Sequence, residues 1–527
     1  MDIKIPEIQE DELTPTVKAL LDAVSQCMEI IQSLRDENRQ LKDEIARLKG
    51  GNPRPKLKPS FLDSELINGK GYSRKKRRKN KNKKRMKIDH EVTVKVEKVP
   101  EGSIFKGYSQ YIVQDLTLQS NITRYHREDW LLPGGKRILA PLPEGICGHY
   151  GAKLREYIVN LNYGLNVPQH LILENLEEFD IQISEGQIHK ILTEGHEPLH
   201  EEKERILEVG LKVFPYISVD DTGARHQKKN GYCTHIGNDF FAYFKSTESK
   251  SRINFLKILR GRNTDYVFAN ESFEYMTLQG LPSAKYIRLK GALNRIFKND
   301  DEWESFLKMV GIKSDKEVKI ITEAALLGSI LSHGINRDLV VLSDEAGQFN
   351  VLLHALCWLH AERKVTSIIS INDYQAKIIE NIRSQIWTFY NDLKAYRSSP
   401  DCAVKQLLDS RFEELFSQKT EFETINNALQ LIYQNKKGLL LALERPEVPL
   451  HNNTSENSIR GVATKRKIHG PTRSDLGRQC RDTFMSLKKT CLKLGISFHE
   501  YLFDRLSGAN RILPLYDVMI ERAFPGT

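Results

Sequence analysis

The chain has 527 residues, of which 40 % are hydrophobic and 28 % are charged. This length exceeds one ordinary domain, and the apolar content is enough for real cores, so we expect about three or four domains and exclude disorder throughout. No apolar run reaches the ~18 residues that cross a bilayer, and the acidic start of the chain does not resemble a signal peptide. We therefore expect a cytoplasmic protein that contacts no membrane.

The cysteines are scattered along the chain and include no C-x-x-C pair. Such spacing is typical of reduced thiols and argues against a disulfide framework or a zinc site. The seven positions are Cys27, Cys147, Cys233, Cys357, Cys402, Cys480 and Cys491.

The positive charge of the chain is local. Eleven of the fourteen residues from 74 to 87 are Lys or Arg, so this segment alone carries one charge more than the net +10 of the whole chain. A run of this kind cannot pack and is expected to bind the DNA backbone without sequence preference. The alternative is a linker kept soluble by its charge. The candidate DNA contacts that begin the run are Arg74, Lys75, Lys76, Arg77 and Arg78.

A heptad repeat extends without a break from Val17 to Leu48. β-Branched residues at position a with Leu at position d favour a parallel dimer, and the polar Asn38 at one a position would set its register. The alternative is a helix that packs on its own domain. The Gly and Pro residues after Lys49 end the helix. We therefore predict a coiled-coil homodimerisation helix over 1–50 and a basic DNA-contacting linker over 51–90.

Two segments follow before the first long apolar strand. Residues 91–142 alternate in places, over Val92–Val99 and Tyr111–Leu116, which predicts a small β-rich module. Residues 143–200 show helical periodicity in three short stretches, the last opened by a capping box at Ser184–Gln187. This second segment resembles a helix-turn-helix, although a helical spacer remains open. Its last helix would present Gln187, His189 and Lys190 to solvent.

Two apolar strands each end in a pair of acidic residues. Tyr216–Asp220 is followed by Asp221, and Leu339–Ser343 is followed by Asp344 and Glu345. Strands over 232–236 and 240–244 and a helix over 249–259 complete a meander with a return helix. Because the two acidic strands are expected to be neighbours, their terminal carboxylates would meet at one edge of the sheet.

A third acid, Glu456, lies at a predicted helix start that Asn453 or Thr454 can cap. Helical spacing places Arg460 and Lys467 on the same face as Glu456, where they would meet phosphate groups. The alternative is a surface ion pair between Glu456 and Arg460, worth only ~0.3–0.5 kcal/mol.

Two strand-end aspartates and a helical glutamate are typical of a two-metal phosphoryl-transfer site. Their oxygen-only character favours Mg²⁺ over zinc. Of the neighbouring acids, Asp221 is the stronger candidate for a supporting role. His226 and His360 could lie near, but a single histidine is more often structural.

Five motifs stand out along the chain. They are Gly148–Gly151 (Gly-His-Tyr-Gly), Val219–Thr222 (Val-Asp-Asp-Thr), Leu342–Asp344 (Leu-Ser-Asp), Cys357–Arg363 (Cys-Trp-Leu-His-Ala-Glu-Arg), and Asn452–Arg460 with Arg466 and Lys467 following. Together these motifs resemble the insertion-sequence-66 family of DDE transposases. The N-terminal heptads and the basic stretch also resemble the family, so the likeness covers most of the chain. One departure is that residues 91–140 contain no Cys, where the family carries a presumed zinc module.

The resemblance implies that Asp220, Asp344 and Glu456 are catalytic and hold two Mg²⁺ ions, with Mn²⁺ as a substitute. It implies an enzyme that cuts transposon ends and joins them to target DNA, in a prokaryotic cytoplasm and associated with the nucleoid. Accessory transposition proteins are further candidate partners. The DNA-contacting residues would be Arg460, Arg466, Lys467, Gln187 and Lys190 besides the basic run, and the supporting residues Asp221, Trp358, His360, Arg363 and Asn453.

The expected fold class is α/β, with a ribonuclease-H-like core over 210–365 and 449–527 and an all-helical insertion over 366–448. The stretch from about 262 to 336, between the two aspartates, is longer than the family leads us to expect. Two other functions remain open. One is a catalytically silent DNA-binding protein derived from a transposase, and the other is a metal-dependent nuclease that only hydrolyses.

Overall fold

A computed structural model describes residues 148–524 without a gap, residues 116–143 and 146, and shorter stretches or single residues between 14 and 30 and between 91 and 114. The chain divides into two compact units, residues 1–28 with 120–527, and residues 29–119. The basic run, with Arg74 to Arg78, and the predicted coiled coil beyond residue 30 lie outside the described residues.

The described residues between 16 and 30 are helical. Val17, the first of the predicted heptad positions, packs against the core of the helical insertion of its own chain. Gln26 donates a hydrogen bond to Glu423 of that insertion at 3.2 Å. These contacts are of the kind expected if the helix packs on its own domain, and the predicted homodimer stays a prediction.

The prediction of strands in the β-rich module was wrong for the part of 91–116 that the structure describes, since residues 92–95 and 111–114 form no strand. Their apolar side chains are exposed, Val92 by 83 % and Tyr111 by 90 %, so they bury no sheet face against the residues that the structure describes. An exposed antiparallel hairpin forms further on instead, from β1 (Asp129–Leu131) and β2 (Arg137–Leu139).

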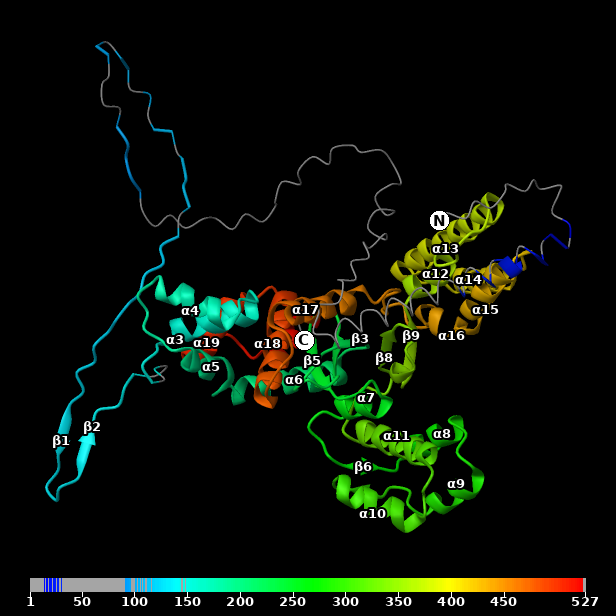
Figure 1. Ribbon diagram of the computed structural model, residues 1–527, viewed down its shortest axis with the longest axis horizontal. Helices are drawn as coiled ribbons and strands as arrows, with labels where there is room; N and C mark the ends of the chain where they lie inside the picture. The colour runs from blue at the N-terminus through cyan, green and yellow to red at the C-terminus, as the bar shows by residue number, and fades with distance from the viewer. Residues whose placement is uncertain are drawn as a thin grey trace. The chain divides into compact units, whose positions relative to one another are not determined.

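One five-stranded mixed sheet organises the rest of the chain, in the order β5-β4-β3-β8-β9 (Figure 1). Strands β3, β4 and β5 form the predicted antiparallel meander, and β8 pairs in parallel with β3 as predicted. Strand β9 pairs in parallel with β8. The bounds are β3 (Tyr216–Gly223), β4 (Tyr232–Gly237), β5 (Ala242–Thr247), β8 (Val340–Ser343) and β9 (Leu353–Leu356).

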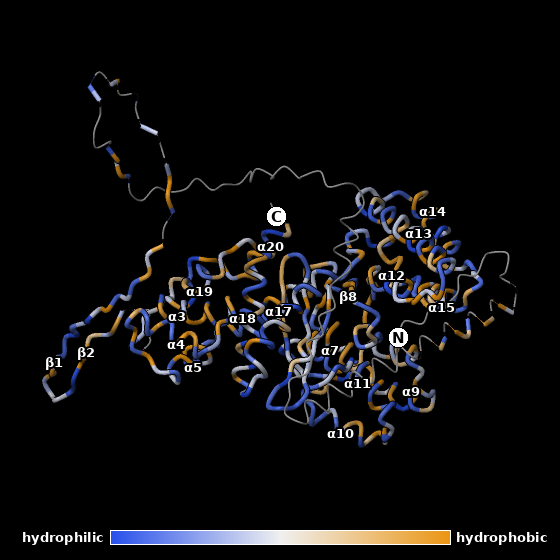
Figure 2. Tube along the Cα trace, turned by 45° about the horizontal axis from the view of Figure 1, so that its top comes forward, coloured by the Kyte–Doolittle hydropathy of each residue, from blue (hydrophilic) through white to orange (hydrophobic). Residues whose placement is uncertain are grey.

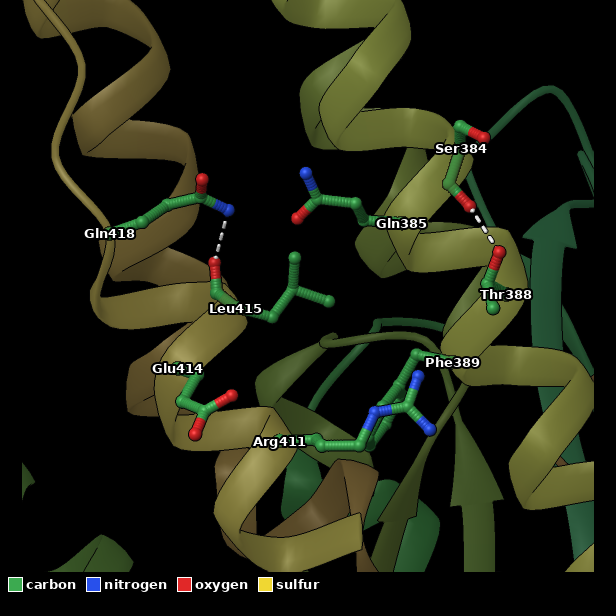
Figure 3. A pocket seen from close by; sticks show the side chains of 8 residues that line it. All are labelled: Ser384, Gln385, Thr388, Phe389, Arg411, Glu414, Leu415 and Gln418. Carbon is green, nitrogen blue, oxygen red and sulfur yellow. Dashed lines mark hydrogen bonds between the residues drawn. The ribbon is translucent and has the colours of Figure 1, made fainter.

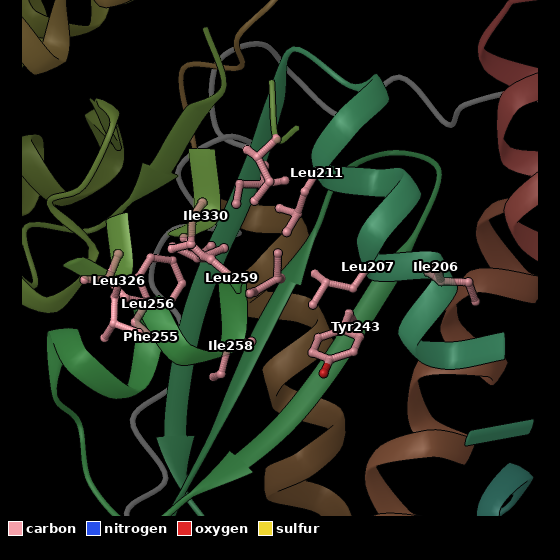
Figure 4. Close-up of a cluster of buried hydrophobic side chains, with 14 of the residues drawn as sticks. Ile206, Leu207, Leu211, Tyr243, Phe255, Leu256, Ile258, Leu259, Leu326 and Ile330 are labelled. Atoms are coloured by element: carbon pink, nitrogen blue, oxygen red, sulfur yellow. The ribbon is translucent and has the colours of Figure 1, made fainter. Parts of the chain in front are cut away.

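Helices cover both faces of this sheet. On one face, α6, α7 and α11 pack apolar side chains against β3, β5 and one another (Figure 4). On the other face, α17 packs on β3 and β4 and α18 packs on β5. The covering helices are α6 (Glu197–Val213), α7 (Arg252–Leu259), α11 (Asp315–Ser332), α17 (Asn453–His469) and α18 (Asp475–Lys493). The chain therefore has the expected α/β class.

The three helices of the predicted helix-turn-helix segment form, and Ser184 caps the third by accepting a hydrogen bond from the Gln187 amide at 3.2 Å. Their buried residues belong to the same core as α18, so they do not make a separate core. Helices α19 and α20 are the last two helices that the structure describes. The bounds are α3 (Ala152–Val159), which continues as η2 (Asn160–Gly164), α4 (Gln169–Glu177), α5 (Glu185–Thr193), α19 (Phe498–Leu506) and α20 (Leu515–Ala523).

Two helical insertions interrupt the core, the first between sheet strands β5 and β8 and the second between the last strand, β9, and α17. The first lies between α7 and β8 and is built on aromatic stacking, with the rings of Tyr266 and Trp303 4.8 Å apart. Gly328 on α11 is required there, because a Cβ would lie 2.1 Å from the carbonyl oxygen of Val267. Its other elements are β6 (Tyr266–Val267), α8 (Asn270–Leu278), α9 (Ser283–Lys290), β7 (Ile296–Phe297) and α10 (Asp300–Val310).

The second insertion is all helical, as predicted over 366–448, but it begins earlier than predicted, because α12 packs into the same core. Hydrophobic and hydrophilic residues alternate along its helices (Figure 2), and their apolar faces form a separate core around Trp358 and Phe389. Its elements are α12 (Trp358–Thr366), α13 (Asp373–Ser398), α14 (Cys402–Ser417), α15 (Glu423–Gln434), α16 (Lys436–Leu439) and η4 (Leu441–Leu443). Among the described residues, no helix has the length and apolar character that a bilayer crossing requires.

Candidate active site

The first two predicted acids belong to neighbouring parallel strands, with Asp344 directly after β8 and Asp220 within β3, which continues to Gly223 instead of ending at Asp220 as predicted. Ser218 of β3 pairs with Leu342 of β8. Two residues further along each strand, this register brings Asp220 beside Asp344. Both side chains are half-buried. The strand pairing therefore places these two carboxylates at one edge of the sheet.

Alternation along β3 separates Asp220 from Asp221. Asp220 pairs with His235 of β4 and lies on the sheet face that α17 covers. Because successive side chains of a strand point to opposite faces, Asp221 points away from α17. The Asp221 carboxylate is buried on the other face, where it contacts Lys250 Nζ at 2.5 Å and accepts a hydrogen bond from Gln348 Nε2 at 2.9 Å. Asp220 is therefore the aspartate that faces α17.

The third acid, Glu456, lies in the first turn of α17, as predicted. Two hydrogen bonds attach the start of this helix to the sheet beside Asp220. Asn452 Nδ2 donates to the carbonyl oxygen of Val219 at 2.7 Å, and Ser455 Oγ lies 2.9 Å from His235 Nδ1. Because Val219 precedes Asp220 and Ser455 precedes Glu456, these contacts determine how close the two acids come.

The predicted helix cap was wrong. The residue that precedes α17 is Asn452, and Asn453 is already the first helical residue. Asn452 makes no capping bond with its side chain, because that side chain reaches across to β3 instead. Asn453 is half-buried.

Three cationic or titratable side chains surround the Glu456 carboxylate. His360 Nε2 lies 3.9 Å from Glu456 Oε1, and the guanidinium groups of Arg363 and Arg460 lie 3.8 and 3.9 Å from Oε2. These distances are those of ion pairs without hydrogen bonds. Glu456 Oε1 is buried and has no hydrogen-bond partner among the described residues. A buried carboxylate oxygen without a donor is poised to accept another positive charge.

The pKa of Asp220 is raised to about 7. Burial is the largest cause, and the negative charges of Asp344, Asp221 and Glu456 raise it further, against a hydrogen bond from the Asp221 amide that lowers it. The mutual effect of the carboxylates means that they are close enough to repel one another. Ionisation of all of them at neutral pH requires compensating positive charge.

The donor set fits a hard divalent cation, because Asp220, Asp344 and Glu456 offer only carboxylate oxygens and one of these, Glu456 Oε1, lacks a partner. In this conformation, however, no three His, Cys, Asp or Glu side chains of the described residues are close enough together to hold one ion. The Glu456 carboxylate is drawn to Arg363 and Arg460 rather than to the aspartates.

The model of the family described as "Transposase IS66 family" matches residues 341–479, a range that includes Asp344, α12 and Glu456. The chain belongs to the IS66 transposase family. A protein of Sinorhizobium fredii (strain NBRC 101917 / NGR234), named "Uncharacterized protein y4jO", is 40 % identical over 321 residues, which are 60 % of this chain and 100 % of the relative. Membership supports a transposase-type function and a DNA-processing enzyme in general.

Several residues around the acids of this IS66 family member escaped sequence reasoning. Asn452 could have been found, since it stands beside Asn453 in the motif that carries Glu456. His235, Ser455, Lys250 and Gln348 reach the site only through strand pairing and packing, and no local pattern marks them.

The loop after Asp344 is held from several sides. Asp344 Oδ1 accepts a hydrogen bond from the Ala346 amide at 3.0 Å, and Ser343 Oγ lies 2.7 Å from His354 Nε2 on β9. Burial lowers the pKa of His354 to about 4, so this imidazole is neutral at pH 7. The Arg252 guanidinium donates to the carbonyl oxygen of Gly347 in η3 (Gly347–Phe349) at 2.6 Å.

Other predicted site residues lie elsewhere. Trp358 is buried in the core of the helical insertion, where its indole N–H donates to the Leu439 carbonyl at 2.9 Å, so it is a core residue. His226 contacts Thr472 and Asp475 beyond the C-terminal end of β3, and neither contact involves one of the three acids. On α5, Gln187 is half-buried and Lys190 is exposed.

The two cations near the end of α17 are exposed. Arg466 donates a hydrogen bond to the carbonyl oxygen of Gly223, the last residue of β3. Lys467 lies next to it, in the last turn of the helix. The helix thus carries Glu456 at one end and these cations at the other.

A cavity of about 290 Å³ lies between α13 and α14 (Figure 3). It contains none of the three acids, and we assign no chemistry to it. It is lined by Ser384, Gln385, Thr388, Phe389, Arg411, Glu414, Leu415 and Gln418.

Proposed function

We propose that the chain is a DDE transposase with a ribonuclease-H-like core, and that it cleaves DNA at transposon ends and transfers the cut strand to target DNA. Asp220, Asp344 and Glu456 are its catalytic acids. The observation that carries the proposal is the register of β3 with β8, together with the Asn452 hydrogen bond that holds the start of α17 beside Asp220.

The topology supports the proposal. Three antiparallel strands followed by two parallel strands, in the order β5-β4-β3-β8-β9, match the arrangement expected of a ribonuclease-H-like core. The central strand β3 supplies the first acid and its parallel neighbour β8 the second. A helix packed on β3 then supplies the third acid.

The three carboxylates would hold two Mg²⁺ ions, with Mn²⁺ as a substitute. When bound, such a pair of ions activates the attacking water or 3′-hydroxyl and stabilises the leaving oxygen. The positive charge would also offset the burial and the carboxylate repulsion that raise the pKa of Asp220.

The remaining residues position the acids and the phosphate. Asn452 and the His235–Ser455 pair keep Glu456 beside β3. Arg363 and Arg460 are exposed enough to reach a DNA phosphate, with 40 % and 63 % of their side chains accessible. A phosphate that takes these two guanidinium groups would release Glu456 from them, because both contacts to Glu456 are longer than hydrogen bonds.

The partners of the proposed enzyme are double-stranded transposon ends and target DNA. Gln187 and Lys190 on α5, the basic run 74–87 and the N-terminal heptads are its proposed contacts to DNA and to a second copy of the chain. Accessory transposition proteins are further proposed partners.

The experiment is cleavage and strand transfer on paired element ends with Mg²⁺, comparing the wild type with Asp344→Asn. The matched control is Asp338→Asn, which removes an exposed carboxylate just before β8. We expect Asp344→Asn to abolish cleavage while end binding in Ca²⁺ is unchanged, and the control to cleave normally.

Full cleavage by Asp344→Asn would remove Asp344 from the mechanism. If the wild type cleaves but transfers no strand, the chain is a nuclease that only hydrolyses. Binding without any cleavage would identify a silent DNA-binding derivative.

A further inference from the structure

The turn between β3 and β4 is joined to the connection between α17 and α18. The Gln227 amide donates to the Thr472 carbonyl at 2.9 Å, and the Thr472 amide donates to the Arg225 carbonyl at 3.3 Å. His226 adds side-chain contacts to Thr472 Oγ1 at 2.9 Å and to Asp475 at 3.1 Å. Two segments that are far apart in the sequence therefore form one rigid surface.

The backbone of this turn is strained. His226 and Lys229 exchange backbone hydrogen bonds of 3.1 and 2.8 Å around a two-residue turn, and its central residues Gln227 and Lys228 both have positive φ, 46° and 65°. Turns of this kind favour Asn-Gly, whose backbone reaches this region at little cost. Strain at two consecutive residues that are not glycine is typical of functional segments. In this turn, Lys228 occupies the second of these two positions, at the tip.

Four cations are exposed on this joined surface: Arg225, Lys228, Lys229 and Arg473. We call them the basic surface. None of them makes a side-chain hydrogen bond or an ion pair with any other residue that the structure describes. The nearby Asp475 contacts His226 and Arg478 instead. The positive charge of the basic surface is therefore not neutralised.

The basic surface continues along the two elements that carry catalytic acids. Gly223, where Arg466 of α17 attaches, is three residues beyond Asp220, which is about 10 Å along a strand. Successive phosphates of a DNA strand that leaves the acids in this direction would pass Arg466 and then the tip of the turn.

We infer that the basic surface binds the phosphate backbone of duplex DNA beside the scissile phosphate. This inference rests on the proposed function and extends it, since it names how the substrate is held outside the acids. Arg offers two parallel donors to a phosphate and Lys a point charge, and neither distinguishes bases in such contacts. The contact is therefore expected to be independent of sequence and strongly dependent on salt.

The test measures binding of the full chain to a labelled random-sequence duplex at several salt concentrations, in EDTA. The variant replaces Arg225, Lys228, Lys229 and Arg473 with Gln. Its control replaces four exposed cations of the first helical insertion with Gln, which removes the same charge. The control positions are Arg288, Lys290, Lys313 and Lys316.

The slope of log K against log salt is negative, and each lost phosphate contact reduces its magnitude by about 0.9, so we expect a reduction of about 2 to 4 in the variant and none in the control. Equal slopes in the wild type and the variant, or an equal decrease in the control, would overturn the inference. Thermal unfolding of the variant verifies that it is folded. Binding in EDTA needs no catalysis. A wild type that never cleaves would therefore rule out the proposed function, whereas the salt dependence of DNA binding would still test the basic surface.

Discussion

The two ends of helix α17 differ in burial, in charge and in their contacts with the rest of the chain. At its start, Asn452 and Ser455 are at most 1 % exposed and bonded to the sheet, and they hold Glu456 beside Asp220. Near its end, Arg466 and Lys467 are exposed beside the basic surface. One rigid helix thus joins a buried acid to surface cations. Changes at the buried end should alter turnover and metal dependence, and changes at the exposed end should alter salt-dependent binding.

The largest effect is expected from Glu456→Gln. The change keeps the size of the side chain but removes the charge that offsets a bound cation, so cleavage should fall by at least about 10²–10³-fold. DNA binding in Ca²⁺ should stay within a factor of about 2, because Arg363 and Arg460 remain and lose a competing carboxylate. Single-turnover cleavage and gel shift measure the two quantities. Equal loss of both would assign Glu456 to folding rather than to chemistry.

Asn452→Ala should have the next largest effect. Loss of its bond to the Val219 carbonyl frees the start of α17, and the Mg²⁺ concentration for half-maximal cleavage should rise about 10–100-fold, as when a group that orients a metal ligand is removed. Asn453→Ala is the matched control and should leave the Mg²⁺ dependence unchanged. Cleavage by both variants across a Mg²⁺ titration measures the Mg²⁺ midpoint and the maximal rate. A lower maximal rate with the same Mg²⁺ midpoint would show that Asn452 does not position Glu456.

The raised pKa of Asp220 predicts that the stability of the chain depends on pH when no divalent ion is bound. Its pKa is about 7 in the fold against 3.8 ordinarily, so between these values the folded chain keeps a proton that the unfolded chain has lost. The free energy of unfolding should therefore fall as pH rises from about 4 to about 7, by at most about 1.4 kcal/mol per unit from this group. Asp220→Asn should remove this part of the slope in EDTA.

At pH 8 in EDTA, the Asp220→Asn variant should consequently unfold at a higher temperature than the wild type. Added Mg²⁺ should stabilise the wild type more than the variant, since only the wild type has all three acids. Thermal unfolding with and without Mg²⁺ gives all four values. A variant that is less stable than the wild type in EDTA would contradict the raised pKa.

The smallest effect concerns the exposed end of α17. Lys467→Gln removes one exposed cation without breaking a contact within the described chain, so the negative slope of log K against log salt should become shallower by about 0.9 and the maximal cleavage rate should not change. Binding across a salt series measures the slope. A lower cleavage rate at saturating DNA would place Lys467 nearer to the chemistry than its position on α17 suggests.

The sequence predicted the central sheet well because β3 and β8 begin as apolar runs that lead into acids, and the apolar runs are typical of buried parallel strands. The same alternation over 92–95 and 111–114 predicted strands that do not form, and side chains such as Val92 are exposed rather than packed against other residues that the structure describes. A pattern of hydrophobicity shows what a strand could bury, and only the tertiary fold supplies the partner.

The acids were predictable and their surroundings were not. Asp220, Asp344 and Glu456 stand in local motifs, whereas the bond from Asn452 to Val219 joins residues 233 positions apart. The basic surface likewise depends on Thr472 reaching the turn at Gln227. Contacts of this kind depend on how β3, α17 and α18 pack, which no window of the sequence contains.

The most direct test of the shared acid site is Mn²⁺ binding to the chain on a duplex element end, followed by electron paramagnetic resonance. We expect the wild type to bind two ions, each of Asp220→Asn, Asp344→Asn and Glu456→Gln to lose tight binding, and the neighbouring control Glu345→Gln to match the wild type. Unchanged Mn²⁺ binding by any one of the three variants would contradict a site shared by all three acids.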